Sequence, residues 1–275
     1  MLFVTFTQDF AITLEQLALL ITMNFCVQLL VDVFCVKFVD KIGYRASCIF
    51  ASLCCAAGFI GVGIFPYIMS DAYAGIILAT VIAAVGSGFI EVTVSPVVEA
   101  LPSDSKAASM IFLHSVYCWG CVAVILLSTL YFNVAGMANW RYLPMLWAVI
   151  PLFNLFFFMK VPILKLVEDH ERIPVKKLFA GKFFMLFVVF MLCAGAIEQS
   201  MSQWASLFAE SGLGVSKTVG DLLGPCAFAV LMGVSRTFLG TRKSKINLEH
   251  TLLVCGIGCL GAYLLTVFSP LPLLS

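Results

Sequence analysis

Charge is scarce in this chain of 275 residues: only 11% of them are Asp, Glu, Lys or Arg, while 62% are apolar. An ordinary globular protein carries about 25% charged residues, because a water-exposed surface has to be polar. The mean hydropathy of +1.07 leaves a lipid bilayer as the solvent that suits such a composition. A soluble enzyme, a nucleic-acid-binding protein and a disordered linker are therefore excluded.

Several catalytic signatures are also missing. The chain has no Gly-rich phosphate-binding loop with a Lys, no HExxH pair and no GxSxG nucleophile elbow. The sequence thus shows no motif for ATP-driven or hydrolytic chemistry. We expect that the protein is not an enzyme and that it binds no cofactor. The 11 cysteines lie in or at the ends of apolar stretches, and we interpret them as packing residues, with no metal site and no disulfide.

Long stretches without Asp, Glu, Lys or Arg predict an all-α integral membrane protein with about eight complete transmembrane helices. A helix needs about 20 apolar residues to cross a bilayer, and the shorter stretches reach that length once a polar interruption is allowed. Residues 1–10 are too few to cross, so we interpret them as a stub of a further helix. The stretches are 16–31, 46–70, 72–90, 107–140, 142–159, 183–197, 222–235 and 251–275.

The positive residues test this arrangement, because they collect in cytoplasmic loops. Alternate connections hold all of the 16 Lys and Arg residues except Arg141 and Lys217. We therefore expect a multi-pass protein of the plasma (inner) membrane. The first Lys is Lys37, so no cationic segment of a cleaved signal peptide precedes the first apolar stretch.

The longest polar segment divides the chain. We expect an N-terminal six-helix bundle over residues 1–160, with an incomplete first helix, and a cytoplasmic linker over 161–182. Residues 183–275 are expected to form a partial C-terminal bundle of three helices. Aromatic residues near the outer end of the 142–159 helix, such as Trp140, fit either an interfacial belt or plain packing.

Carboxylates occur inside the predicted spans. A charged group at bilayer depth costs about 2.5 kcal/mol or more and marks a cavity, a partner or a function. Glu91 lies well inside the span that starts at residue 72, on the same helical face as Ser87, and we expect it to face a polar central cavity. Gln28 and Asp32 form a similar polar stripe on the first complete span. Asp32 either faces the same cavity or, because it lies near the cytoplasmic loop, contacts water or pairs with a Lys there.

Polar side chains also gather beside an aromatic residue in the helix that opens at Phe183. Amides next to an aromatic ring suit a hydroxyl-rich ligand, although hydrogen bonding between helices explains them equally well. On another helix, His114 is either a packing residue or, because it titrates near neutrality, a proton relay. Our candidates for solute contact are His114, Tyr117, Glu198, Gln199, Gln203 and Trp204.

Asp40-Lys41-Ile42-Gly43-Tyr44-Arg45 resembles the signature loop of the major facilitator superfamily, although Val36 stands where that family usually has Gly. A weaker match to the same signature, Gly233-Val234-Ser235-Arg236, lies where the two-fold repeat of the family places a second copy of this loop. The resemblance implies that Asp40, Gly43, Arg45 and Arg236 form the gating motif.

A second stretch, Gly86-Ser87-Gly88-Phe89-Ile90-Glu91, is similar to the fourth helix of the fucose:proton symporter branch. Gly195-Ala196-Ile197-Glu198 with Trp204 is similar to the seventh helix of related sugar permeases. The resemblance implies a partial major facilitator fold, with Glu91 as the proton-coupling residue. Only helices one (its end) to nine of the family are covered, so we expect a chain truncated at both ends.

The resemblance thus implies a secondary active transporter of a small polar solute, with a sugar favoured, that works by alternating access and proton coupling. Its partners would be the solute, a proton and the lipid bilayer, with no nucleic acid. Drugs, organic acids and nucleosides stay open as cargo, because fold does not fix cargo. The alternative is a truncated, non-transporting membrane remnant or scaffold protein.

Overall fold

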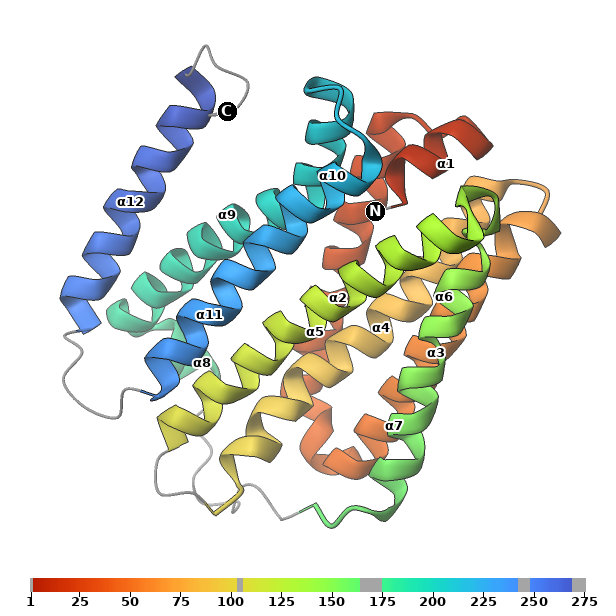
Figure 1. Ribbon diagram of the computed structural model, residues 1–275. Helices are drawn as coiled ribbons and strands as arrows, with labels where there is room; N and C mark the ends of the chain where they lie inside the picture. Colours follow the sequence, from red (N-terminus) through yellow and green to blue (C-terminus); the bar gives the residue numbers. More distant parts are fainter. Residues whose placement is uncertain (1, 103–105, 164–174, 242–247, 269–275) are drawn as a thin grey trace.

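The computed structural model describes residues 2–102, 106–163, 175–241 and 248–268. These residues form helices and no strands, and the long helices run up and down between two ends of the molecule (Figure 1). The elements are α1 (Phe3–Phe10), α2 (Leu14–Ile42), α3 (Tyr44–Ile68), α4 (Ala72–Glu99), α5 (Lys106–Ala135), the 3-10 turn η1 (Met137–Asn139), α6 (Tyr142–Trp147), α7 (Val149–Lys160), α8 (Val175–Phe179), α9 (Lys182–Gly212), α10 (Lys217–Asp221), the π-helical turn η3 (Leu222–Cys226), α11 (Ala227–Thr241) and α12 (Leu248–Phe268).

Eight stretches within the described ranges are long and apolar enough to cross a bilayer, which confirms the all-α membrane fold with eight spans. Two of them are built from more than one helix. Tyr142–Lys160 combines α6 and α7, and Lys217–Leu239 combines α10, η3 and most of α11. The 8-residue α1 is too short to cross, as expected for the stub.

The connections alternate between the two ends of the molecule. The α2–α3 connection, the start of α5 and the end of α7 lie at the lower end in Figure 1. The α1–α2, α5–α6 and α9–α10 connections lie at the upper end. The lower end is the one to which the positive residues assign the cytoplasm.

Local signals fix where α2 begins and ends. Thr13 caps its first turn: the Thr13 hydroxyl accepts from the Gln16 backbone N–H, and the Gln16 side chain accepts from the Thr13 N–H. At the other end Gly43 has a φ of 92°, which side-chain-bearing residues rarely adopt, and it turns the chain directly into α3.

The helices α3 and α4 pack in very close contact because glycines face backbone. A Cβ atom placed on Gly86 would lie 2.6 Å from the carbonyl oxygen of Ala51. A Cβ atom on Gly58 would lie 2.6 Å from the backbone nitrogen of Ala83. Small residues allow such approach in a bilayer, where van der Waals contact replaces the hydrophobic effect as the force that holds helices together.

An aromatic cluster closes the non-cytoplasmic end of the N-terminal helices. Trp140 is only 1% exposed, and its indole N–H donates to the Asp9 carboxylate at 2.7 Å. The rings of Phe6 and Phe10 contact it edge to face, with centroids 5.3 and 5.9 Å away. Of the two readings left open for Trp140, packing is therefore the one that the structure shows.

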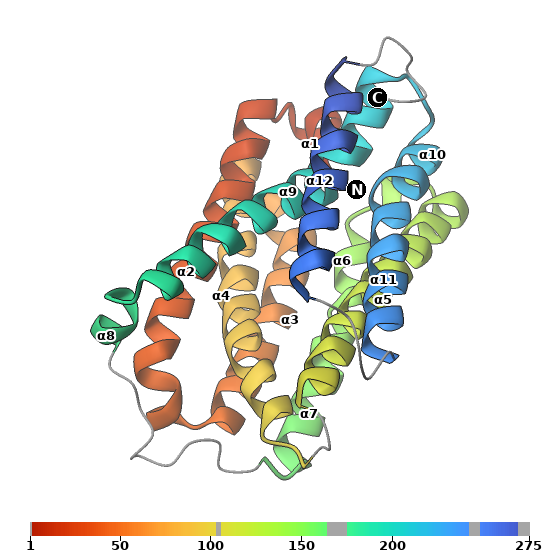
Figure 2. The same cartoon turned by 90° about the vertical axis from the view of Figure 1, so that its left-hand side faces the viewer.

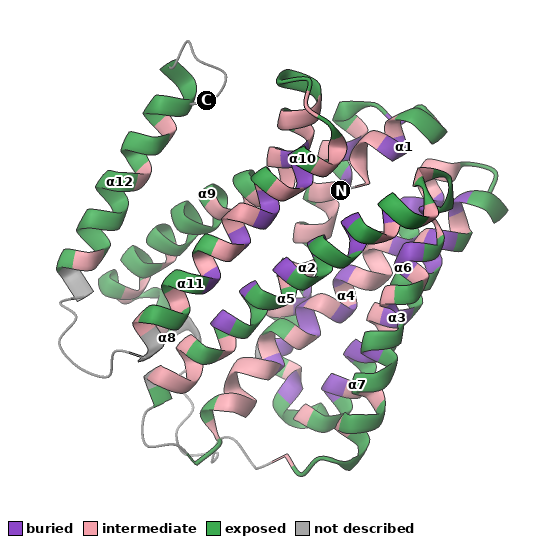
Figure 3. Cartoon of the chain, viewed as in Figure 1, coloured by how far each residue is buried: buried purple, intermediate pink, exposed green. Residues whose placement is uncertain are grey.

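The C-terminal helices meet the N-terminal ones along α5. Both Figures 1 and 2 show α11 alongside α5, and Val122 and Ile125 of α5 pack against Cys226 and Ala229. In contrast, the surface of α9 and α12 is mostly uncovered by the rest of the chain (Figure 3). The described hydrogen bond between α12 and α9 runs from the Tyr263 hydroxyl to the Ile197 carbonyl, at 3.2 Å.

Candidate functional site

Polar side chains of α2 and α4 face each other at bilayer depth. Gln28 donates from its amide to the Ser87 hydroxyl at 2.9 Å. The two helices approach closely here because Gly88 has no side chain: a Cβ on it would lie 2.9 Å from Val31. The two polar stripes seen in the sequence are therefore opposite sides of one contact between helices.

Two carboxylates follow in the next turn of that contact. Glu91 of α4 lies one turn beyond Ser87, its side chain is exposed, and it interacts electrostatically with Asp32 of α2. The Asp32 Oδ1 atom is buried without a hydrogen-bond partner. Neither acid forms an ion pair with a residue that the structure describes. Two neighbouring acids with no cation beside them among the described residues make a site that can accept a proton or a cation.

A second polar cluster lies where α5, α9 and α11 meet. Arg236 of α11 is 3.7 Å from the Glu198 carboxylate of α9, and each side chain is about one third exposed (31% and 34%). The other guanidinium nitrogen of Arg236 donates to the His114 carbonyl at 3.4 Å and reaches Cys118 Sγ at 3.5 Å. Arg236 thus connects all three helices.

Tyr117 of α5 belongs to the same cluster. It interacts electrostatically with Glu198 and with Cys121, one turn further along α5. Tyr117 is 57% exposed as a residue, and its hydroxyl has a hydrogen bond with the Cys121 side chain. His114 contributes through its backbone carbonyl, while its side chain is exposed.

The amide stripe predicted on α9 continues toward the non-cytoplasmic end. Gln203 donates to the Gln199 side-chain oxygen at 3.5 Å, and Ser202 donates to the same oxygen at 3.2 Å. Trp204 contacts the ring of Phe3 in α1, with centroids 6.0 Å apart. Trp204 therefore joins α9 to the first helix.

These candidates form two separate groups. The structure brings Tyr117, Glu198, Arg236 and the His114 backbone together, while on α9 Gln199 directly follows Glu198 and Gln203 lies between one and two turns beyond it. Glu91 lies with α2 instead, and within the described ranges no hydrogen bond or ion pair joins it to the other group.

Residues at the turn between α2 and α3 connect this turn to the end of α7. Asp40 accepts a hydrogen bond from the Tyr44 hydroxyl at 3.1 Å. The Arg45 guanidinium donates to the carbonyls of Met159 at 2.8 Å and Val161 at 2.9 Å, and so satisfies the end of α7. Of the four residues expected to form the gating motif, Gly43 lies at the turn between α2 and α3, Asp40 and Arg45 lie in the helix ends beside it, and Arg236 lies in the Glu198 cluster.

One buried acid was missed by the sequence reasoning. Asp221 is 1% exposed; it accepts from the Ser206 hydroxyl at 2.5 Å and lies 3.3 Å from the Lys217 ammonium. Lys217 is also 3.6 Å from Glu210. The i,i+4 spacing of Lys217 and Asp221 could have indicated the pair, but the charges next to the span indicated an outer loop.

The fold and the polar groups within the spans define a multi-pass helical membrane protein with polar clusters between its helices. The sequence model of the Major Facilitator Superfamily matches residues 1–275, so the chain belongs to this superfamily. Its members are secondary transporters of small solutes rather than enzymes. No curated protein and no solved structure matches the chain.

Proposed function

We propose that the chain carries a small polar solute, in the first instance a sugar, across the plasma membrane by alternating access. The observation that carries this proposal is the Tyr117–Glu198–Arg236 cluster. It places hydrogen-bonding groups from three helices at bilayer depth, on the contact between the N-terminal and C-terminal helices. Residues 1–160 and 183–275 are the two bundles that would move about this contact, with 161–182 as their cytoplasmic linker.

The chemistry of the cluster supports a hydroxylated solute. A carboxylate and a guanidinium accept and donate strong hydrogen bonds, and the exposed Tyr117 ring adds an apolar face. Gln199, Gln203 and Trp204 extend the same helix surface. The incomplete burial of Glu198 and Arg236 leaves room for a solute to exchange hydrogen bonds with either of them. The resemblance of residues 86–91 to the fucose:proton symporter branch, and of residues 195–198 with Trp204 to related sugar permeases, supports the same class of solute.

Glu91 is our proposed proton-coupling residue. It is exposed within the chain, has no ion-pair partner among the described residues, and lies beside the acid Asp32. Repulsion between the two acids makes uptake of one proton favourable, and loss of that proton on the other side of the membrane would complete a cycle. Asp40, Gly43 and Arg45 would hold the cytoplasmic ends of α2, α3 and α7 together during this motion.

Uptake by proteoliposomes that contain the full chain tests the coupling. Glu91→Gln keeps the size of the side chain but cannot lose a proton. We expect it to exchange labelled sugar between the two sides but to lose accumulation driven by a proton gradient, by tenfold or more. Glu99→Gln, two turns further along α4, is the matched control and should accumulate sugar normally. Unchanged uphill uptake by Glu91→Gln would refute the coupling role.

The same vesicles test the solute. Labelled monosaccharides, a nucleoside and an organic acid are supplied in parallel, and saturable uptake of a monosaccharide is expected. Glu198→Gln should then raise KM by about ten- to a hundredfold, because loss of one charged hydrogen bond costs about 1.5–3 kcal/mol. Its proton dependence should not change. Uptake of the nucleoside or the acid alone would reject a sugar as cargo.

A further inference from the structure

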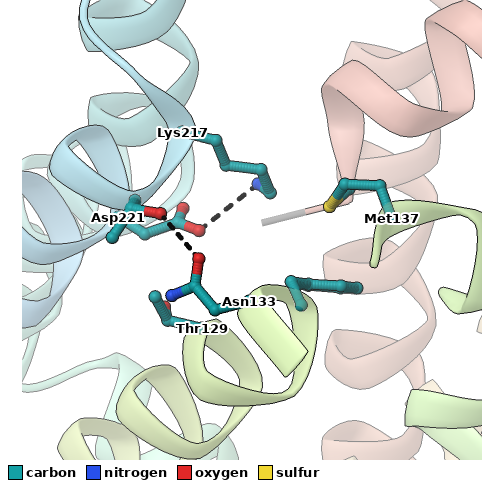
Figure 4. Close-up of a pocket in the computed structure, with 7 residues that line it drawn as sticks. Thr129, Asn133, Met137, Lys217 and Asp221 are labelled. Atoms are coloured by element: carbon teal, nitrogen blue, oxygen red, sulfur yellow. Dashed lines mark hydrogen bonds and ion pairs between the residues drawn. The ribbon is translucent and has the colours of Figure 1, made fainter. Parts of the chain in front are cut away.

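A cavity of about 100 Å³ lies at the non-cytoplasmic end of the contact between the two groups of helices. Figure 4 shows its walls, which come from the end of α5, from η1 and from α10. It is separate from the Glu198 cluster and from Glu91. The residues that line it are Thr129, Phe132, Asn133, Met137, Lys217, Thr218 and Asp221.

One buried oxygen atom on the wall of this cavity, Thr129 Oγ1, has no hydrogen-bond partner among the described residues, and a second, Asp221 Oδ2, has only the Lys217 ammonium 3.3 Å away. Thr129 is 7% exposed and Asp221 is 1% exposed. An unsatisfied buried polar atom costs about 1–3 kcal/mol, so the Thr129 hydroxyl beside a cavity indicates a polar occupant. The Thr129 hydroxyl can donate and accept, whereas the carboxylate can only accept.

The charged side chains around the cavity pair with one another. Lys217 lies 3.3 Å from Asp221 and 3.6 Å from Glu210, so its ammonium takes the place that a bound cation would need. The two acids outnumber the one ammonium, which disfavours an anion. A neutral occupant fits this balance best.

The other walls match a molecule with several hydroxyl groups. The Thr218 hydroxyl and the Asn133 side chain meet across the gap at 3.5 Å, a long contact that an occupant with hydroxyl groups can replace (Figure 4). The Phe132 ring, 5.9 Å from the Lys217 ammonium, provides an apolar side for carbon atoms. Drug-sized ligands need about 300–1,000 Å³, so only a small molecule or one end of a larger one fits here.

The helix next to the cavity is interrupted by a π-helical turn, a feature that fits a ligand site. The π-helical turn η3 follows Asp221 directly and contains Pro225, which has no backbone N–H. Such π-turns within helices are frequent at functional sites. The Ser206 hydroxyl, which donates to Asp221, fixes the carboxylate from the neighbouring helix α9.

We propose that this cavity binds a small, uncharged polyol, through the Thr129 and Thr218 hydroxyls, the Asn133 amide and Asp221 Oδ2, which can accept a hydrogen bond beside its contact with Lys217. The inference rests on the proposed function in one respect, since it makes the cavity an outer subsite that receives the hydroxylated end of the solute. Binding itself does not require transport or Glu91.

Saturation-transfer NMR on the full chain in lipid nanodiscs tests the proposal with glycerol as the probe. Wild-type protein should transfer saturation to glycerol. Thr129→Val, which keeps the shape of the side chain, and Asp221→Asn should each reduce the transfer at least fivefold. Thr22→Val is the matched control, because the Thr22 hydroxyl bonds only to the Ala18 carbonyl of its own helix, and it should match the wild type.

Two results would overturn the polyol site: no transfer to glycerol in wild type, which would mean a cavity filled by water alone, or equal transfer in wild type and both variants. If Asp221→Asn does not fold, Thr129→Val decides the question. Glu91→Gln should bind glycerol normally. A loss of proton-driven uptake with intact glycerol binding, or the reverse, therefore separates failure of one proposal from failure of the other.

Discussion

The helices α3 and α4 are covered by the rest of the chain, whereas α9 and α12 are not. In both α3 and α4, 39% of the most apolar 18-residue stretch is buried, and in α9 and α12 the value is 0%. Hydropathy does not explain this difference, since α4 and α12 have nearly the same mean value, 2.0 and 2.1. The hydropathy of a helix determines whether it enters the bilayer, but it does not determine which other helices it packs against.

Small residues and specific hydrogen bonds make the difference. Gly86 of α4 faces the backbone of α3, while Gly256 and Gly258 of α12 have no other atoms within 4 Å of where a Cβ would lie. Glycine alone is therefore not a packing signal. It stabilises a contact only where a second backbone lies opposite to it.

Among the variants that test this comparison, Trp140→Ala is expected to lower the free energy of unfolding most. Removal of a buried aromatic side chain costs about 3–5 kcal/mol, and here the hydrogen bond to Asp9 is lost as well. Phe183→Ala is the control, because Phe183 of α9 is 81% exposed. The free energy of unfolding, measured by denaturant titration in detergent micelles, should fall strongly for Trp140→Ala and stay near wild type for Phe183→Ala.

A smaller effect is expected from Gly86→Ala. The added methyl group would lie 2.6 Å from the Ala51 carbonyl oxygen, so α3 and α4 have to separate. Overpacking of this kind costs about 1–3 kcal/mol. Gly256→Ala in α12 adds the same methyl group to open space and should be neutral or slightly stabilising. Equal loss in both variants would contradict a role for the close contact between α3 and α4.

The smallest effect is expected from Tyr263→Phe, which removes the hydrogen bond from α12 to the Ile197 carbonyl. Hydrogen bonds between membrane helices contribute about 0.6 kcal/mol on average, so the melting temperature should change little. Hydrogen exchange of the α12 amides is the more sensitive measurement, and protection should decrease there but not in α4. Destabilisation as large as that of Trp140→Ala would show that α12 is held as firmly as the N-terminal helices.

Much of the fold could be predicted because each signal lies within one helix. Apolar length predicted the eight spans, positive loops predicted the alternation of ends, and the Gly43 turn lies in the expected loop. The partners of the candidate site residues could not be predicted in this way. The gating role of Arg236 stays a prediction, but its contact with Glu198 could not be foreseen, because spacing along the chain says nothing about which helix lies opposite.

By itself, the sequence determined that this protein lies in a membrane and how often it crosses, because these properties depend on the free energy of transferring one segment into lipid. Only the tertiary structure decided that Gln28 faces Ser87, that Arg236 joins α5 to α9, and that Thr129 and Asp221 share a cavity. Those contacts join residues far apart in the chain. They depend on how helices that are equally soluble in lipid fit against one another.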